Sequence, residues 1–260
     1  MTQPVPTPTS PFAKLPRLDP TESKRTVLLK GLSGSGKTES ALSFPGPLTV
    51  IHTDRNFATL NAAVARGVKV DPIPVSSWKD YEQVIVPAIA NRELDCQTVV
   101  VDTVDFLLDL MWREIQGTRS KLTQPDWGTG LTQASQTTFS ITSAAHAVPG
   151  RRSYNIVFNC HLKNVTNEDG GLVRIAPALK GAFEAAIENY FDYVLLLEAG
   201  VTTTIVGTPP VAKKDRKFIV YTVPPTPLHT CKGGSLPAEV VIPNGRGLYE
   251  TLWPTPVSNG

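Results

Sequence analysis

Residues 31–38 read Gly31-Leu32-Ser33-Gly34-Ser35-Gly36-Lys37-Thr38, and this stretch decides the fold because it matches the phosphate-loop pattern G-x-x-x-x-G-K-[ST]. Glycines let the backbone curl so that successive N–H groups point at a phosphate. In this pattern the lysine reaches the β- and γ-phosphates of a nucleotide, and the Ser or Thr hydroxyl binds Mg²⁺. The residues predicted to bind ATP are therefore Gly31, Ser33, Gly34, Ser35, Gly36, Lys37 and Thr38.

The residues on both sides of this loop fit the strand–loop–helix setting that the pattern requires. Residues 26–30 (TVLLK) are typical of a short buried strand. Residues 38–43 can start a helix, which Phe44-Pro45-Gly46-Pro47 must end because proline cannot continue a helix. The alternative interpretation is a glycine turn that binds no nucleotide, and this context disfavours it.

Composition and charge narrow the class of protein. The chain has 260 residues, 41% hydrophobic and 18% charged, which is enough for one globular α/β domain. A formal net charge of +2 argues against binding by bulk charge but permits a local basic groove. The three cysteines form no C-x-x-C pair, which disfavours disulfides or zinc and fits a reducing cytoplasm. Because no apolar run approaches ~18 residues and no signal-peptide core is present, we expect no membrane association.

The chain divides into a tail and one expected domain. Residues 1–23 are rich in Pro, Thr and Ser, which predicts a disordered tail. Residues 24–260 are expected to form a single domain, in which strand and helix patterns alternate. Strands are predicted at 48–52, 98–101, 155–159 and 193–197, and a short extended piece interrupted by prolines at 68–75. Helices are predicted at 57–66, 78–91, 104–115, 129–148 and 183–190.

This alternation predicts an α/β fold, a mostly parallel twisted sheet with helices on both faces. The last part of the chain differs in character. Residues 202–206 and 217–223 are typical of antiparallel strands, and we expect a charged turn at Lys213-Lys214-Asp215-Arg216 to join them. The sequence therefore predicts a small C-terminal antiparallel extension of the sheet.

A carboxylate at the end of a second buried strand completes the expected nucleotide site. Mg²⁺ bound to Thr38 needs an acidic ligand opposite, usually an Asp that ends a neighbouring strand. Asp102 follows the β-branched run Val99-Val100-Val101 and meets this requirement. Thr38 and Asp102 are therefore the predicted metal ligands. Capping of the helix that follows Thr103 is an alternative role for Asp102, and it is compatible with metal binding.

Hydrolysis also needs a group that orients or deprotonates water. We expect the strand at 48–52 to lie beside the strand of the phosphate loop, so that Asp54 emerges at the same sheet edge as the catalytic base. Helix capping is its alternative role. His161 follows the strand at 155–159, where it, or Asn159, could contact the γ-phosphate. The alternative is an ordinary hydrogen-bonded histidine at a strand end.

Two polar segments, 113–127 and 163–178, show little regular pattern and are predicted to be long loops. Their basic residues would meet nucleic-acid phosphates, and Trp127 could stack on a base. A mobile surface loop and a tryptophan of the core are equally open alternatives. The residues predicted to bind single-stranded DNA are Arg113, Arg119, Lys121, Trp127, Lys163 and Arg174.

These features occur in an order that resembles the ATPase core of RecA-type recombinases. The quoted stretches are the phosphate loop, Asp54, TVVVDTVDFL at 98–107 and NIVFNCHLK at 155–163. The chain looks similar in particular to small phage-encoded RecA-like ATPases, including the Sak-type single-strand annealing proteins. Residues 177–181, 191–194 and 231–237 are also similar to theirs, so the resemblance covers about residues 25–253.

The resemblance implies a RecA-like P-loop NTPase core that uses ATP and Mg²⁺. It also implies head-to-tail assembly of identical subunits in rings or helical filaments, with ATP at the interface. Lys232 lies where the family places a basic residue that reaches the neighbour's γ-phosphate. The chain departs from the family in having Asp54 instead of Glu as the base, and Gly233-Gly234 after Lys232 where relatives often carry Arg. Lys213, Lys214 or Arg216 could therefore replace Lys232.

The implied function is ATP-dependent binding of single-stranded DNA in phage recombination or annealing, within the host cytoplasm. Its implied partners are single-stranded DNA, further copies of the chain and a single-strand-binding protein. The alternatives are a P-loop nucleotide or small-molecule kinase, and an ATP-gated assembly factor that hydrolyses poorly. Few arginines in the possible lids disfavour the kinase, and the lack of an N-K-x-D motif disfavours a GTPase.

Overall fold

The computed structural model describes residues 23–53, 57–206, 211–243 and 246–254, with only the backbone described for 201–206 and 211–216. Of the predicted tail, all but Ser23 lies outside these ranges. The strands are β1 (Thr26–Gly31), β2 (Leu48–His52), β3 (Val70–Pro74), β4 (Thr98–Asp102), β5 (Asn155–Thr166), β6 (Leu172–Pro177), β7 (Tyr193–Val206), β8 (Val211–Tyr221) and β9 (Glu239–Ile242). The helices are α1 (Lys37–Ala41), α2 (Ala58–Ala65), α3 (Trp78–Asp80), η2 (Tyr81–Ile85), α4 (Val86–Ala90), α5 (Val104–Gln116), α6 (Gln124–Thr142), η3 (Ser143–Ala145), α7 (Phe183–Ala186), η4 (Ile187–Tyr190) and α8 (Leu248–Leu252).

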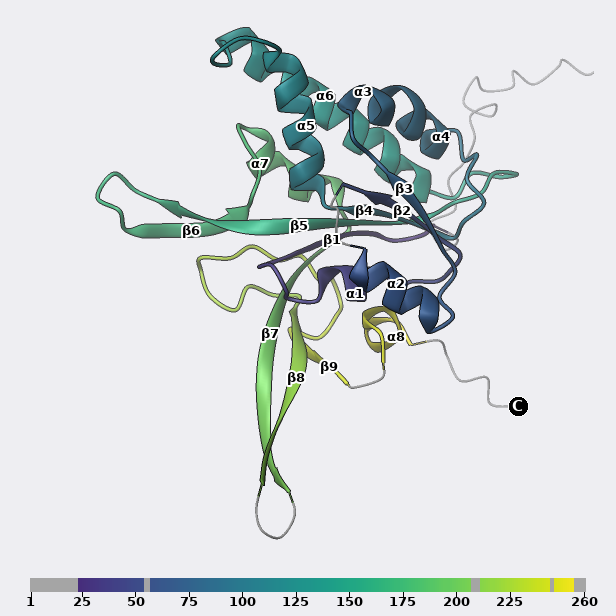
Figure 1. Ribbon diagram of the computed structural model, residues 1–260, viewed down its shortest axis with the longest axis vertical. Helices are drawn as coiled ribbons and strands as arrows, with labels where there is room; N and C mark the ends of the chain where they lie inside the picture. Colours follow the sequence, from purple (N-terminus) through teal and green to yellow (C-terminus); the bar gives the residue numbers. More distant parts are fainter. Residues whose placement is uncertain (1–22, 54–56, 207–210, 244–245, 255–260) are drawn as a thin grey trace, which may run out of the picture.

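The described strands form one mixed sheet in the order β3-β2-β4-β5-β1-β7-β8-β9, with β6 paired to β5. The strands from β3 to β7 along this order run parallel, and β8 and β9 add antiparallel pairs. Helices cover both faces (Figure 1). The predicted α/β fold class, a mostly parallel sheet with helices on both faces and an antiparallel C-terminal extension, is therefore confirmed.

The position of β2 differs from our expectation. We expected it beside β1, but β4 and β5 lie between them, and β2 pairs with β3 and β4. The continuous apolar run of β4 needs cover on both faces, which a central position provides. Pro72 and Pro74 lack N–H donors, and β3, which contains them, forms the edge of the sheet.

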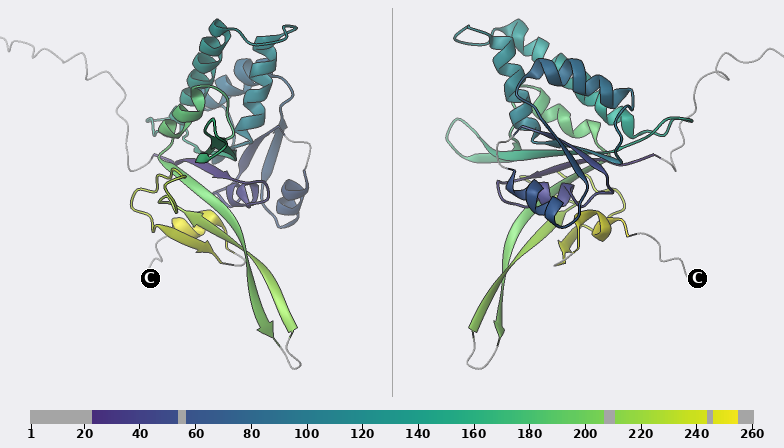
Figure 2. Two further views of the ribbon diagram at one scale, coloured as in Figure 1. Left: turned by 90° about the vertical axis from the view of Figure 1, so that its left-hand side faces the viewer. Right: turned by 45° about the vertical axis from the view of Figure 1, so that its right-hand side comes forward.

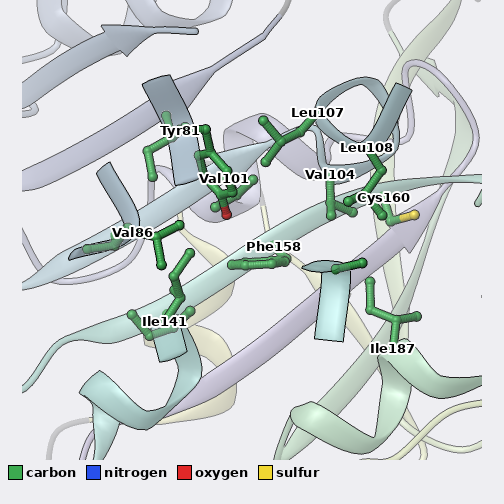
Figure 3. Packing of buried hydrophobic residues seen from close by; sticks show 14 of the residues in the cluster. Tyr81, Val86, Val101, Val104, Leu107, Leu108, Ile141, Phe158, Cys160 and Ile187 are labelled. Atoms are coloured by element: carbon green, nitrogen blue, oxygen red, sulfur yellow. The ribbon is translucent and has the colours of Figure 1, made fainter. Parts of the chain in front are cut away.

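Alternating side chains of the central strands divide the core into two layers. Val99 and Val101 of β4 pack with α3 to α6 on one face, whereas Val100 packs with α1, α2 and α8 on the other. Figure 3 shows Val101 and Phe158 among the buried side chains of the first layer. Among the described residues, no helix is both long and apolar enough to cross a membrane.

The predicted loop at 113–127 is too long: residues 117–123 form a connection without regular structure, but both ends of the predicted segment are helical. α5 continues to Gln116, and α6 begins at Gln124, five residues before the predicted start at Thr129. Thr123 caps α6: its N–H and hydroxyl both donate to Asp126 Oδ2, at 2.6 and 2.7 Å. Pro125 lies in the first turn, where its missing N–H costs nothing. The polar residues at 123–127, which were predicted as part of the loop, therefore cap and start a helix.

The predicted loop at 163–178 is also wrong, because these residues form the β5–β6 hairpin. The two strands pair in antiparallel register, with Asn164 opposite Ile175. Asn167 Oδ1 accepts a hydrogen bond from the N–H of Gly171 at 2.6 Å and stabilises the turn. The predicted turn at 213–216 is wrong as well, since these residues lie inside β8 and pair with β7. The β7–β8 hairpin extends far from the sheet (Figure 2).

Candidate active site

The phosphate loop lies at the carboxyl end of β1, between that strand and α1. Gly36, the residue before Lys37, has a φ of +90°, which favours glycine. A Cβ at this position would also lie 2.6 Å from the ring of Phe218, which belongs to β8. Both the backbone conformation and the packing therefore require glycine at position 36. The contact with Phe218 shows that β8 packs against the phosphate loop.

Lys37 is folded into this loop. Its Nζ donates to the carbonyl oxygens of Gly31 and Leu32, both at 2.9 Å, and the residue is only 5% exposed. Burial lowers the pKa of the Lys37 ammonium, while the charges of Asp102 and Asp105 act in the opposite direction. Anionic phosphate would stabilise the charged ammonium better than these two neutral carbonyls do.

The two predicted metal ligands lie in direct contact. Thr38 Oγ1 donates to Asp102 Oδ2 at 2.8 Å, which joins the start of α1 to the end of β4. The other carboxylate oxygen, Oδ1, accepts a hydrogen bond from Asn159 Nδ2 at 2.9 Å. Mg²⁺ in nucleotide sites is commonly held by one or two protein oxygens together with substrate phosphates and water. The pair of Thr38 and Asp102 provides such ligands.

Several buried polar atoms near this edge have no hydrogen-bond partner among the described residues. They are Ser35 Oγ, Thr103 Oγ1, Asn159 Oδ1 and both ring nitrogens of His52. A buried polar group without a partner costs about 1–3 kcal/mol, so its presence needs an explanation. Ser35 lies in the phosphate loop, His52 ends β2, and Thr103 follows β4. Asn159 lies within β5, in register with Asp102. This clustering fits a site that a polar ligand such as Mg²⁺-bound ATP completes.

His161 is held by a residue that the sequence analysis missed. Its backbone N–H donates to Asp105 Oδ1 at 3.1 Å, and its Nδ1 lies 2.9 Å from Asp105 Oδ2. Burial alone would raise the pKa of Asp105, but the hydrogen bonds and charge of His161 outweigh burial and leave that pKa below its ordinary value. The available sequence signal was a second acid in the first turn of α5, three residues after Asp102.

The predicted base Asp54 lies outside the described residues, but its neighbour Thr53 is described. The N–H of Thr103 donates to Thr53 Oγ1 at 3.1 Å, and the N–H of Thr53 donates to the carbonyl oxygen of Asp102 at 3.1 Å. The chain after β2 therefore leaves the sheet at the edge that carries Asp102.

Within a single subunit, Lys232 does not lie at the edge of the sheet that carries the phosphate loop. Its Nζ donates to the carbonyl oxygen of Phe191 at 2.7 Å, and its backbone pairs with Val194. Phe191 precedes β7, in which Tyr193 is in register with Val27 near the start of β1. Lys232 thus lies toward the opposite edge of the sheet from the phosphate loop.

The predicted DNA-binding residues fall into two groups. Three are paired with acids: Arg119 makes two contacts to Asp126, at 2.9 and 3.0 Å, and both Lys163 and Arg174 contact Glu184. Arg113 and Lys121 are exposed, and within the described part of the chain no ion pair involves them.

Trp127 packs inside the molecule rather than in a loop. Its ring centroid lies 4.8 Å from that of Trp112, and it is one of the partly buried residues against the main core cluster. Of the three interpretations that the sequence left open for Trp127, the structure shows the tryptophan of the core. Stacking of Trp127 on a base would require this contact to open.

Two cavities lie near the phosphate loop. One of about 350 Å³ is lined by Leu32, Ser33 and Ser35 on one side and by His229 and residues of β5, β6 and β7 on the other. A larger one of about 830 Å³ runs along α1 but includes no residue of Gly31–Thr38. The smaller cavity therefore adjoins the phosphate loop, but neither cavity is lined by Lys37, Thr38, Asp102 or His161.

Comparison with known proteins gives one family match. A family model described as an AAA domain matches residues 23–232. No curated protein matches the chain. A solved structure, the flagellar accessory protein FlaH from Methanocaldococcus jannaschii, is similar with 10% sequence identity and a TM-score of 0.41. The comparison covers 87% of this chain and 88% of FlaH.

Proposed function

The chain belongs to the AAA domain family, and from this premise we propose that it binds ATP with Mg²⁺ at residues 31–38 and hydrolyses it. The observation that carries the proposal is the hydrogen bond of 2.8 Å between Thr38 Oγ1 and Asp102 Oδ2. It brings together residues from two separate motifs, as a shared Mg²⁺ site requires. The unpartnered polar atoms around this pair support the same conclusion.

Each residue has a defined role in this proposal. Lys37 leaves the carbonyl oxygens of the loop and binds the β- and γ-phosphates. Thr38 and Asp102 hold Mg²⁺, which neutralises charge on the phosphates when it is bound. Asn159 fixes the Asp102 carboxylate through its hydrogen bond to Oδ1. Asp54 or His161 acts on the attacking water.

We further propose that the protein uses ATP to act on single-stranded DNA, in phage recombination or annealing, as an oligomer of identical subunits. The resemblance to RecA-type proteins supports this, and the exposed cations Arg113 and Lys121 are available to phosphates. Leu32 is 66% exposed and Phe106 is 46% exposed, both near the phosphate loop, which fits a contact with a second subunit. In such an assembly Lys232 or a basic residue of β8 would approach the neighbour's site.

The test is ATP hydrolysis by the full chain with and without single-stranded DNA, together with the variant Lys37→Ala. We expect turnover that DNA stimulates, and loss of ATP binding and turnover in the variant by about 10²-fold or more. Lys79→Ala, an exposed lysine on α3, is the matched control and should behave as wild type.

Each element of the proposal fails separately. An unchanged ATPase rate in Lys37→Ala would remove the phosphate-loop assignment. If single-stranded DNA neither binds nor stimulates turnover, the DNA role is wrong. Phosphate transfer to a nucleoside or nucleotide would instead identify a kinase. Electron microscopy with ATP and DNA should show rings or filaments if the subunits assemble as proposed.

A further inference from the structure

We propose that His161 and Asp105 form a proton-accepting pair for the water that attacks the γ-phosphate. In this pair His161 is the catalytic residue, and Asp105 is a positioning residue that acts through it. The inference rests on the proposed ATP hydrolysis, and it goes beyond that proposal by naming the group that takes the proton.

The location of the pair is set by the sheet. His161 is in register with Gly31, the first residue of the phosphate loop, on the directly adjacent strand β5. Asp105 lies in the first turn of α5, which follows Asp102 on the other neighbour of β5. Asp105 is 8% exposed and is close enough to Lys37 to influence its ionisation. Both residues therefore lie at the phosphate-binding edge.

The hydrogen bonds define which ring nitrogen carries the proton. An ionised carboxylate only accepts hydrogen bonds, and the pKa of Asp105 is held below its ordinary value, so Asp105 is ionised at neutral pH. Nδ1 of His161, at 2.9 Å from Asp105 Oδ2, must then carry the hydrogen. In the neutral ring this leaves the lone pair on Nε2.

The lone pair on Nε2 determines which groups can hydrogen-bond to His161, because it can only accept a hydrogen bond. The His161 side chain is 26% exposed, and Nε2 has no hydrogen-bond partner among the described residues. A lone pair and a phosphate oxygen are both acceptors and cannot hydrogen-bond to each other. A water molecule can donate to Nε2, and it is the nucleophile that hydrolysis needs. The geometry thus favours contact with water over contact with phosphate in the resting state.

The step is balanced with the residues present. The water oxygen forms a bond to the γ-phosphorus as one of its O–H bonds breaks, and Nε2 takes that proton. The bond between the γ-phosphorus and the β–γ bridging oxygen breaks, and ADP leaves with the electron pair. The resulting imidazolium lies against the Asp105 carboxylate, which stabilises its charge without taking the proton. Release of phosphate and loss of the proton to solvent restore the neutral ring.

The first part of the test measures the tautomer in the nucleotide-free protein. Ring ¹⁵N chemical shifts should show His161 protonated at Nδ1 in wild type, assigned by the loss of its signals in His161→Asn. In Asp105→Asn the amide can donate to Nδ1, so the hydrogen should move to Nε2. This readout is independent of ATP turnover. A wild-type ring protonated at Nε2 would overturn the positioning role of Asp105.

The second part measures kinetics with four variants. We expect His161→Gln and His161→Asn to lower kcat by about 10²–10⁴-fold with unchanged ATP affinity. Asp105→Asn should also lower kcat, by about 10²-fold or more, with unchanged KM. Asp109→Asn, one turn further along α5 and paired with Lys180, is the matched control and should retain wild-type kcat. Circular dichroism confirms that each variant is folded.

The outcomes distinguish this inference from the proposed function. If wild type hydrolyses ATP and both folded His161 variants retain wild-type kcat, the pair is not the proton acceptor. Loss of turnover in Asp54→Asn under those conditions would assign that role to Asp54. If wild type does not hydrolyse ATP at all, the proposed function fails and the inference fails with it.

Discussion

The phosphate-binding edge of the sheet and the two outer hairpins carry similar polar residues in opposite states. At the edge, Ser35, Asn159 and His52 keep buried atoms without partners among the described residues. In the α5–α6 and β5–β6 hairpins, Arg119, Lys163 and Arg174 are matched with acids. Both regions looked functional from the residue types that they contain.

The difference between them is whether the chain itself satisfies these polar side chains. The contrast concerns the three cations of the hairpins, since Trp112 Nε1 and Gln133 Oε1 of the α5–α6 hairpin are also buried without a partner among the described residues. A buried unpartnered group loses its hydration and gains nothing in return, so it persists where something else binds it. A basic side chain already paired with a carboxylate must give up that partner before it binds a phosphate. Polar residues with unmet hydrogen bonds therefore mark a binding site better than basic residues in an irregular segment do. The following changes test this distinction.

Among these changes, the largest effect is expected for Asp102→Asn. The amide retains the shape and can still accept from Thr38, but it loses the charge that Mg²⁺ needs, so kcat should fall by about 10²–10³-fold. The Mg²⁺ concentration for half-maximal turnover should rise. Titration of ATPase activity with Mg²⁺ checks this, and Asp95→Asn, whose side chain is 96% exposed, is the control. An unchanged Mg²⁺ dependence would place the metal elsewhere.

A second effect concerns the packing of the α5–α6 hairpin. A Cβ at Gly130 would collide with the ring of Trp112, whereas at Gly128, in the same helix, nothing lies within 4 Å. Gly130→Ala should therefore lower the free energy of unfolding by about 1–3 kcal/mol. Gly128→Ala should raise it by about 0.5–1 kcal/mol through helix propensity. Urea denaturation measures both. Equal effects would mean that residues 124–142 do not pack as a continuous helix on α5.

The parts of this fold that local patterns specify were predictable from sequence. The loop at Gly31–Thr38 lies between a strand and a helix as expected, and Asp102 ends a central strand. Such features depend on residues within about ten positions of one another. Their contact across the sheet, between Thr38 and Asp102, followed from the general rule that the carboxyl ends of parallel strands meet at one edge.

The features that depend on distant residues were not predictable. The insertion of β4 and β5 between β1 and β2 reflects competition among strands for central positions. The role of Asp105 appears only when β5 brings His161 beside α5. The loops predicted at 113–127 and 163–178 were wrong for a local reason. Thr123 caps a helix and Asn167 stabilises a turn, and the same types of polar residue also occur in loops.

A third effect tests whether unpaired cations bind DNA. The double variant Arg113→Ser/Lys121→Ser should weaken binding of single-stranded DNA several-fold. Each lost phosphate contact should reduce the slope of log affinity against log salt by about 0.7. Fluorescence anisotropy at several salt concentrations measures both. Lys163→Ser, which removes a cation already paired with Glu184, should leave the slope unchanged. If instead Lys163→Ser reduces the slope and the double variant does not, the β5–β6 hairpin is the DNA-binding element. Paired cations would then bind DNA as well as unpaired ones do.

The smallest effect concerns Asp126 at the start of α6. Hydrogen bonds from the Thr123 side chain and backbone, and then Arg119, lower the pKa of this carboxyl from 3.8 to about 2. A carboxyl group whose pKa is lower in the folded state stabilises the fold fully at pH values above its ordinary pKa. This contribution is lost as the pH falls through the pKa of the folded state, about 2. Asp126→Asn should therefore destabilise the protein at pH 6 and have less effect at pH 3, as measured by urea unfolding.

Because Asp126 stabilises the helix start and takes no part in phosphate chemistry, Asp126→Asn should retain wild-type ATP turnover at neutral pH. Arg119 would lose its ionic partner in this variant and keep only its hydrogen bonds to the carbonyl oxygens of Ile115 and Gln116, so that it could bind phosphate more readily. If DNA affinity rises as stability falls, then pairing with Asp126 is what keeps Arg119 from binding DNA. If affinity does not change, Arg119 lies away from the DNA, and the α5–α6 hairpin contacts the DNA through Arg113 and Lys121.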